Sequence, residues 1–166
     1  AGSDLVVLGL GRLGGGALTH ASDLDMIYLF SGEIAEESDG GRPLTASLYY
    51  NRLSQRVSAA LSVPTAAGAL YEVDTRLRPQ GAQGPLAVSF DMFERYQRED
   101  AWTWEHMALT RARLVLGPPA LCEGVRGAID RTLRRPRDAG KLAADVAEMR
   151  RRIEAEKRTA DPWDTK

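Results

Sequence analysis

The stretch that decides the fold is residues 11–30, GRLGGGALTHASDLDMIYLF. It begins with a glycine-rich turn, passes through the small and polar residues THAS, and enters an apolar run at Leu24. Two carboxylates, Asp23 and Asp25, stand where that run begins. If residues 23–30 form a β-strand, alternate side chains share a face, so both carboxylates point the same way. The pattern predicts a polar site at the start of a buried strand.

This carboxylate pair is typical of a metal site. Two like charges on one face repel each other, and burying them unpaired is costly. A divalent cation removes the repulsion, and carboxylate oxygens suit Mg²⁺ or Mn²⁺. The upstream glycines let backbone amides approach an anion, as phosphate-binding turns require. Together these features favour a site for a metal-bound nucleoside triphosphate, whereas each motif alone is also common in solvated strand ends and ordinary loops.

The order of these parts narrows the fold. An apolar strand at 5–10 (LVVLGL) precedes the glycine turn, and the carboxylates open a second apolar strand. The interval between the glycines and the Asp-x-Asp pair does not fit the P-loop or Rossmann fingerprints. It resembles nucleotidyltransferases of the polymerase-beta type.

A third carboxylate follows in residues 69–77, ALYEVDTRL, which alternate as a strand. Asp74 sits inside that strand, where acidic residues are rare. If this strand lies beside residues 23–30, Asp74 can complete a three-carboxylate cluster with Asp23 and Asp25. Arg76 and Arg78 follow, and guanidinium groups bind triphosphate oxygens in bidentate fashion. The alternative is that these arginines only pair with the aspartates.

The remainder of the chain reads as mainly helical. Periodicity and capping signals predict helices at 43–61, 89–100, 121–133 and 142–157, and a well-buried helix over 101–117. His106 is expected to be an ordinary helix residue and no zinc ligand, because His20 lies far away in the sequence. We therefore predict an α+β fold: a small mixed β-sheet carrying the site, flanked by helices, with a mostly helical carboxy-terminal half.

Composition limits the class of protein. The 166 residues are 43% hydrophobic, which is one domain's worth of chain with an ample core. A formal net charge of -1 gives no electrostatic ground for a nucleic-acid or membrane partner. No apolar stretch approaches the roughly 20 residues of a membrane span. The single cysteine, Cys122, excludes an intrachain disulfide and fits a reducing compartment, so we expect a cytoplasmic protein.

Several separated motifs, in order, resemble the glutamine synthetase adenylyltransferase family. They are residues 8–30, 71–86 (YEVDTRLRPQGAQGPL), 96–117 (YQREDAWTWEHMALTRARLVLG), 149–157 (MRRRIEAEK) and 161–166 (DPWDTK). Members are bifunctional bacterial enzymes with two homologous nucleotidyltransferase domains: one removes AMP from glutamine synthetase by phosphorolysis, and the other adds it from ATP. The block at 101–113 is similar to the carboxy-terminal, adenylylating copy.

The resemblance implies roles for particular residues. Metal binding and catalysis fall to Asp23, Asp25 and Asp74, with Asp74 also a candidate acceptor of the tyrosine proton. Triphosphate binding falls to Gly14, Gly15, Ser22, Arg76 and Arg78. In one respect the chain departs from the family, because residues 16–18 read GAL where many members carry Arg-Glu-Leu. If that arginine or glutamate contacts ATP in the family, the contact is missing here.

The expected function is transfer of AMP from ATP to a tyrosine of glutamine synthetase, with Mg²⁺ or Mn²⁺ and release of pyrophosphate. The alternatives are the phosphorolytic de-adenylylating domain of the same enzyme and a non-catalytic regulatory nucleotide-binding module. Glutamine and a PII-type signalling protein are the implied effectors of the full-length enzyme. Residues 1–118 are expected to form the catalytic core, and 119–166 a helical extension leading into a further helical domain that this chain does not include.

Overall fold

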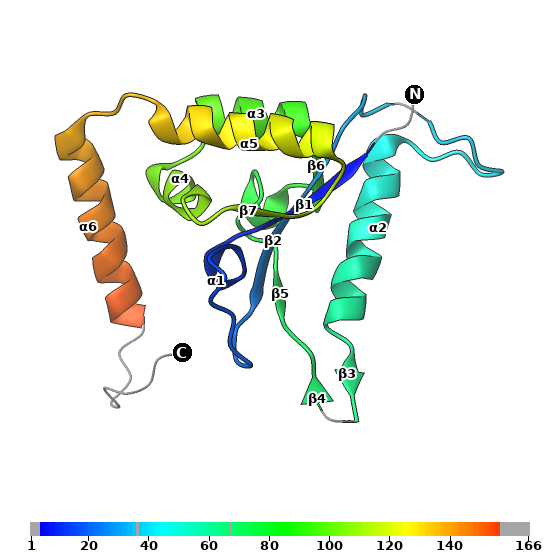
Figure 1. The fold of residues 1–166 in the computed structure, drawn as a ribbon, viewed down its shortest axis with the longest axis horizontal. Helices are drawn as coiled ribbons and strands as arrows, with labels where there is room; N and C mark the ends of the chain where they lie inside the picture. Colours follow the sequence, from blue (N-terminus) through cyan, green and yellow to red (C-terminus); the bar gives the residue numbers. More distant parts are fainter. Residues whose placement is uncertain (1–3, 36, 67, 157–166) are drawn as a thin grey trace.

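The computed structural model describes residues 4–35, 37–66 and 68–156. In this part of the chain a five-stranded mixed sheet is combined with helices, which confirms the predicted α+β class (Figure 1). The strands of this sheet are β1 (Leu5–Gly9), β2 (Leu24–Phe30), β5 (Val73–Asp74), β6 (Ala87–Ser89) and β7 (Arg113–Leu116). A separate two-stranded ribbon is formed by β3 (Pro64–Thr65) and β4 (Gly68–Ala69).

Strand β2 lies at the centre of the sheet, whose order is β5-β2-β1-β7. Strand β1 runs antiparallel to both β2 and β7. Along the other edge of β2, β5 and then β6 pair with it in parallel. Because β2 has neighbours on both edges and packing on both faces, it is an almost continuous apolar run. Its one acidic residue, Asp25, is held at the end where β5 pairs.

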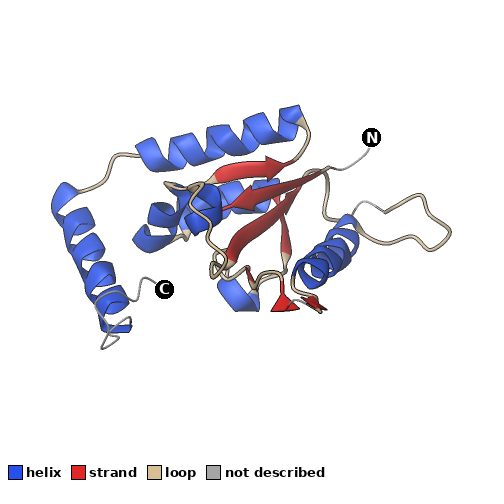
Figure 2. Ribbon diagram, turned by 60° about the horizontal axis from the view of Figure 1, so that its bottom comes forward, coloured by secondary structure: helices blue, strands red, loops and turns tan. Residues whose placement is uncertain are grey.

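Helices cover both faces of the sheet (Figure 2). On one face Ile27 and Leu29 pack in a core with Phe93, Leu109 and Val125. These last three belong to helices α3 (Phe90–Glu99), α4 (Thr103–Leu109) and α5 (Pro119–Arg134). On the other face the core lies under helix α2 (Ala46–Leu61), where the rings of Phe30 and Tyr50 stack with centroids 5.0 Å apart.

Two sequence-based predictions were wrong in detail. The predicted helix over 101–117 ends at Leu109, and Arg113–Leu116 instead forms β7, because the free edge of β1 offers backbone hydrogen bonds to an apolar segment. Trp102, predicted to be buried, is 70% exposed. Likewise, of the predicted strand at 69–77 only Val73–Asp74 pairs with β2. The glycine turn contains the four-residue helix α1 (Gly11–Gly14), and the loop at 79–85 contains a 3₁₀ turn (Gly81–Gln83).

The carboxy-terminal helices differ in how they pack. Helix α3 begins after Ser89, whose Oγ accepts a hydrogen bond from the Met92 amide at 3.3 Å, as the predicted cap requires. Helix α5 contributes Leu121 and Val125 to the core. Helix α6 (Ala139–Glu156) has no buried residue among those described and packs against α4. The predicted boundary near residue 118 stays a prediction, and Lys157 and the motif at 161–166 lie outside the described residues.

None of the described helices is both long enough and apolar enough to cross a lipid bilayer.

His106 joins α4 to the segments around it. Its Nε2 donates to the Gln97 carbonyl at 3.0 Å, and its Nδ1 accepts from Arg137 Nη2 at 3.1 Å. This pairing requires the neutral imidazole with its proton on Nε2. Burial, together with the nearby charge of Arg137, lowers the pKa of His106 below its ordinary value. His106 is thus a satisfied helix residue, as the sequence predicted.

A pH dependence of stability follows from the lowered pKa of His106. The His106 imidazole takes up a proton more readily in the unfolded chain than in the folded one. The contribution of neutral His106 to the free energy of unfolding is therefore complete above pH about 6.5, and it is lost as the pH falls toward the folded-state pKa. We expect the urea midpoint to fall between pH 7.5 and pH 5.5. The variant His106→Gln keeps a donor and an acceptor but cannot titrate, and its midpoint should fall less. Equal falls in the two proteins would contradict the assignment.

Candidate functional site

The register between β2 and β5 brings two of the predicted carboxylates together. Leu24 pairs with Val73, and Asp25 pairs with Asp74, in a parallel arrangement. Residues paired in this way project from the same face of a sheet. The strand carrying Asp74 thus lies beside the strand carrying Asp25, which meets the condition stated for the carboxylate cluster. Asp23 directly precedes β2 and is exposed.

The electrostatics of the cluster show an excess of negative charge at Asp25. Burial raises the pKa of the Asp25 carboxyl, and the charges of Asp74 and Asp23 raise it further. By contrast, hydrogen bonds from Arg76 lower the pKa of Asp74. A half-buried carboxylate destabilised by two neighbouring carboxylates fits the donor set of a hard divalent cation such as Mg²⁺ or Mn²⁺.

Arg76 holds Asp74 in a bidentate pair. Its Nε lies 2.8 Å from Oδ2 and 3.1 Å from Oδ1, and its backbone amide donates to Oδ1 at 2.8 Å. The Arg76 side chain is 79% exposed, and that of Asp74 is 16% exposed. The alternative that an arginine pairs with an aspartate thus holds for Arg76. In this arrangement no three Asp, Glu, His or Cys side chains among the described residues converge closely enough to hold a metal ion.

A cavity of about 290 Å³ opens at this cluster. Its lining consists of Asp23, Glu72, Val73, Asp74, Thr75 and Arg76. Glu72 and Thr75 were not among the predicted site residues. Neither stands out in the sequence, because both belong to an alternating strand pattern that is equally typical of a solvated face.

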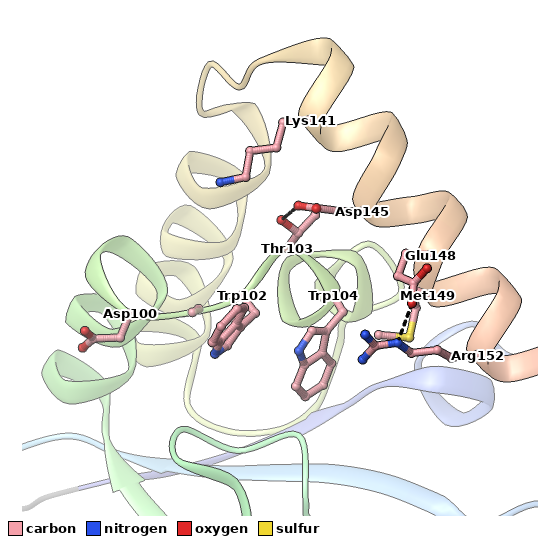
Figure 3. A pocket seen from close by; sticks show the side chains of 10 residues that line it. Asp100, Trp102, Thr103, Trp104, Lys141, Asp145, Glu148, Met149 and Arg152 are labelled. Carbon is pink, nitrogen blue, oxygen red and sulfur yellow. Dashed lines mark hydrogen bonds and ion pairs between the residues drawn. The ribbon is translucent and has the colours of Figure 1, made fainter. Parts of the chain in front are cut away.

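A larger cavity, of about 650 Å³, lies between α4 and α6 (Figure 3). Trp102 and Trp104 line it from the α4 side, and Met149 lines it from α6. The Thr103 hydroxyl donates to Asp145 at 2.6 Å and links the two walls. None of the predicted site residues lines this cavity. We place the candidate site at the smaller cavity because Asp23 and Asp74 line it and Asp25 is paired with Asp74.

Gly14 serves close packing in this structure, whereas Gly15 has more room around it. Their amides donate to the carbonyls of Leu10 at 2.7 Å and Gly11 at 3.1 Å, within α1. A Cβ on Gly14 would lie 1.8 Å from the Arg111 carbonyl oxygen. Gly14 thus allows α1 to pack directly on the segment that leads into β7. The triphosphate-binding role of these two glycines stays a prediction.

Gly11 was missed by the sequence reasoning, although it touches the cluster. Its backbone has a φ of +51°, and a Cβ there would lie 2.1 Å from Asp25 Oδ2. Only a glycine combines this backbone conformation with so close an approach. The start of α1 is therefore placed directly against the Asp25 carboxylate. The glycine-rich composition pointed to this turn, but it did not show which glycine meets Asp25.

Ser22 fixes the loop that leads into Asp23. Its side chain is buried, and its Oγ accepts from the Thr19 amide at 3.0 Å and from Arg12 Nη1 at 3.4 Å. Arg12 also donates to the Thr19 hydroxyl at 3.2 Å. Ser22 therefore orients the chain before the first carboxylate, and its predicted contact with the triphosphate is not tested by these bonds. Arg12 was missed because nothing in its spacing marks it.

Arg78 closes the loop at 79–85. The side chain is only 9% exposed. Its guanidinium donates to the carbonyls of Gly84 at 3.1 Å, Pro85 at 3.0 Å and Thr75 at 2.8 Å, and to the Thr75 hydroxyl at 3.0 Å. Most of its five N–H groups are thus committed to the protein. Arg78 supports the turn that follows Asp74, and its predicted assistance to the nucleotide stays a prediction.

Comparison with known proteins shows which family the chain is similar to. Residues 1–127 match the model of the family described as glutamate-ammonia ligase adenylyltransferase. Curated proteins named bifunctional glutamine synthetase adenylyltransferase/adenylyl-removing enzyme are similar over the whole chain. Those of Mesorhizobium japonicum, Brucella suis and Agrobacterium fabrum are 50%, 53% and 50% identical over 100%, 99% and 99% of this chain. The chain spans 17% of the length of each of these relatives.

The packing of Gly14 predicts an asymmetric effect of two neighbouring substitutions. We expect Gly14→Ala to lower the free energy of unfolding by about 3 kcal/mol, because its methyl group must displace the Arg111 backbone. Gly15→Ala is the matched control, since its Cβ would meet nothing closer than 3.2 Å, and it should cost less than about 1 kcal/mol. Urea denaturation measures both. Equal stabilities of the two variants would contradict the packing role.

The hydrogen bonds from Arg78 to the loop at 79–85 predict that removing this side chain makes the loop less ordered. Arg78→Ala leaves several half-buried carbonyls without their donor, so we expect a loss of about 1–3 kcal/mol in the free energy of unfolding and faster proteolysis within the loop. Arg78→Lys keeps the charge but not the planar fork, and should recover less than half of the loss. Arg98→Ala removes only an exposed ion pair with Glu99 and should leave stability and cleavage unchanged. Unchanged cleavage in Arg78→Ala would contradict this role.

Proposed function

The chain belongs to the glutamate-ammonia ligase adenylyltransferase family, and from this premise we propose that it catalyses nucleotidyl transfer at Asp23, Asp25 and Asp74. The reaction we propose moves AMP from ATP to a tyrosine hydroxyl of glutamine synthetase and releases pyrophosphate. The observation that carries this proposal is the pairing of Asp25 with Asp74 across two parallel strands. That pairing supplies the acidic cluster on which metal-assisted phosphate chemistry depends.

The proposed fold is that of the nucleotidyltransferases. Its support begins with the order of the elements, in which β1, the short glycine-rich helix α1 and β2 follow one another. Asp23 directly precedes β2, and Asp25 is the second residue of that strand. A third carboxylate stands on the parallel neighbour strand. The five-stranded mixed sheet between helical layers is compatible with this fold.

The proposed direction of the reaction is adenylylation. The relatives carry both activities in their name, and this chain spans 17% of their length. The block at 101–113, AWTWEHMALTRAR, favours the adenylylating copy by its resemblance. We also propose that the full-length enzyme acts on glutamine synthetase and that glutamine and a PII-type protein are its effectors.

The residues of the site have distinct tasks in the proposed reaction. Asp25 and Asp74, with Asp23 at the rim, would hold Mg²⁺ or Mn²⁺. When bound, such an ion lowers the pKa of the attacking hydroxyl and stabilises charge on the leaving pyrophosphate. Arg76, exposed beside Asp74, supplies a guanidinium within reach of anionic phosphate oxygens. Gly11 places the start of α1 against Asp25 and so fixes one wall of the site.

The proposed reaction is a direct displacement at phosphorus and needs no covalent enzyme intermediate. The tyrosine oxygen forms a bond to the α-phosphorus of ATP, and the bond from that phosphorus to the pyrophosphate oxygen breaks. The hydroxyl proton passes to a base, for which Asp74 is our candidate. Positioning and electrostatics supply the rate in such displacements.

Labelling of glutamine synthetase tests the proposal. The chain is incubated with the synthetase, Mg²⁺ and ATP labelled at the α-phosphate, and labelled synthetase is measured. We expect Asp25→Asn to lower the labelling rate at least about a hundredfold, because it removes one charge from the cluster and keeps the shape. Asp130→Asn is the matched control, since Asp130 is an exposed residue of α5 paired with Arg134, and it should leave the rate unchanged.

The outcomes separate the alternatives. Label that appears with the parent chain and is lost in Asp25→Asn supports adenylylation. Release of ADP from adenylylated synthetase in the presence of phosphate, without labelling from ATP, would show the opposite reaction. Nucleotide binding with neither activity would favour a regulatory module and overturn the proposed catalysis.

A further inference from the structure

The Asp74 carboxylate is enclosed by one residue two positions further along the chain. Both of its oxygens accept hydrogen bonds from Arg76: Oδ2 from the side chain at 2.8 Å, and Oδ1 from the backbone amide at 2.8 Å. The pair is local in sequence and needs no other part of the fold. A metal ion bound by Asp74 would require the oxygens that the Arg76 side chain now occupies.

Arg76 is also the cation whose charge reaches the whole cluster. Its interaction with Asp74 is the strongest, and the charges of Asp23 and Asp25 act on it as well. It opposes the rise in the pKa of Asp25 that burial and the two other carboxylates cause. Arg78 acts on Asp74 too, but its guanidinium is committed to the loop at 79–85. Arg76 therefore stands in the electrostatic position that a bound cation would take.

The pair between Arg76 and Asp74 is suited to exchange. The Arg76 side chain is 79% exposed, and exposed ion pairs contribute little stability because water screens them. A long, solvated arginine side chain leaves such a pair at small cost. Asp74, at 16% exposure, is the more fixed partner. Displacement of Arg76 is thus cheaper than displacement of the carboxylate.

We infer that Arg76 is a counter-ion that a divalent cation displaces: it neutralises Asp74 in the metal-free site, and it turns to the phosphates of the nucleotide once Asp74 binds the metal. This inference rests on the proposed function. It assigns Arg76 two opposite effects. Arg76 competes with the metal ion in the absence of nucleotide, and it strengthens nucleotide binding when the metal is present.

Binding of Mn²⁺ without nucleotide tests the first effect. Free Mn²⁺ is measured by electron paramagnetic resonance during titration of the 166-residue chain. We expect Arg76→Gln to bind Mn²⁺ about fivefold more tightly than the parent chain, because the competing ion pair is gone. Arg76→Lys, which keeps the charge but not the fork, should fall between the two. Arg98→Gln, which removes another exposed arginine, should bind as the parent does.

Binding of ATP in saturating Mn²⁺ tests the second effect. We expect Arg76→Gln to weaken it about tenfold, since a charge-assisted contact to phosphate is lost. Opposite changes in the two affinities are the signature of the exchange, because a merely structural arginine would shift both in one direction. The exposed position of Arg76 makes the variants compatible with folding, which circular dichroism checks.

Each result has a definite meaning. Equal Mn²⁺ affinity in Arg76→Gln and the parent chain would overturn the inference while leaving the proposed function intact. Tighter Mn²⁺ binding with unchanged ATP affinity would also overturn it. If neither protein binds Mn²⁺, or if Asp25→Asn leaves the parent's Mn²⁺ affinity unaltered, the proposed metal site itself fails, and the inference fails with it.

Discussion

The parallel pairing of β2 with β5 is the constraint on which the site depends. It sets Asp25 opposite Asp74, so that two carboxylates that repel each other lie side by side in a half-buried position. The register is fixed by the rest of β2, whose side chains alternate between two cores, with Ile27 and Leu29 on one face and Tyr28 and Phe30 on the other. A slip by one residue would reverse every side chain of the strand. The hydrophobic effect along β2 therefore holds together charges that would separate on their own.

Several residues around the cluster determine its shape through contacts with the protein. Gly11 lets the start of α1 meet Asp25, and Gly14 lets the same helix meet the backbone before β7. Ser22 orders the approach to Asp23, and Arg78 orders the turn after Asp74. Both ends of the acidic segments are thus fixed by hydrogen bonds to backbone atoms. Such support keeps carboxylates in place when no opposite charge binds them.

The sequence allowed part of this arrangement to be predicted. The apolar alternation of β2 and the acid inside the later strand marked Asp25 and Asp74 as candidates, because strand periodicity is local. That the two strands pair was only a condition of the prediction, because pairing joins segments far apart in the sequence. The start of the helix predicted at 89–100 could also be predicted, because Ser89 is a residue type that caps helices. Segment 113–116 could not, since its apolar residues suit a helix as well as a strand, and the free edge of β1 decided the outcome. The burial of Arg78 could not be foreseen either, because arginine is mostly exposed and its partners are backbone carbonyls, which no residue type in the sequence marks.

We propose that the carboxylates brought together by β2 and β5 bind the divalent cation of a nucleotidyl-transfer site. Crystals of this chain grown with Mn²⁺ and a non-hydrolysable ATP analogue test it directly through the anomalous scattering of manganese. We expect an anomalous peak in contact with Asp25 and Asp74, with the phosphates of the analogue beside it. A manganese peak at the cavity between α4 and α6, or an analogue bound away from these two residues, would contradict it.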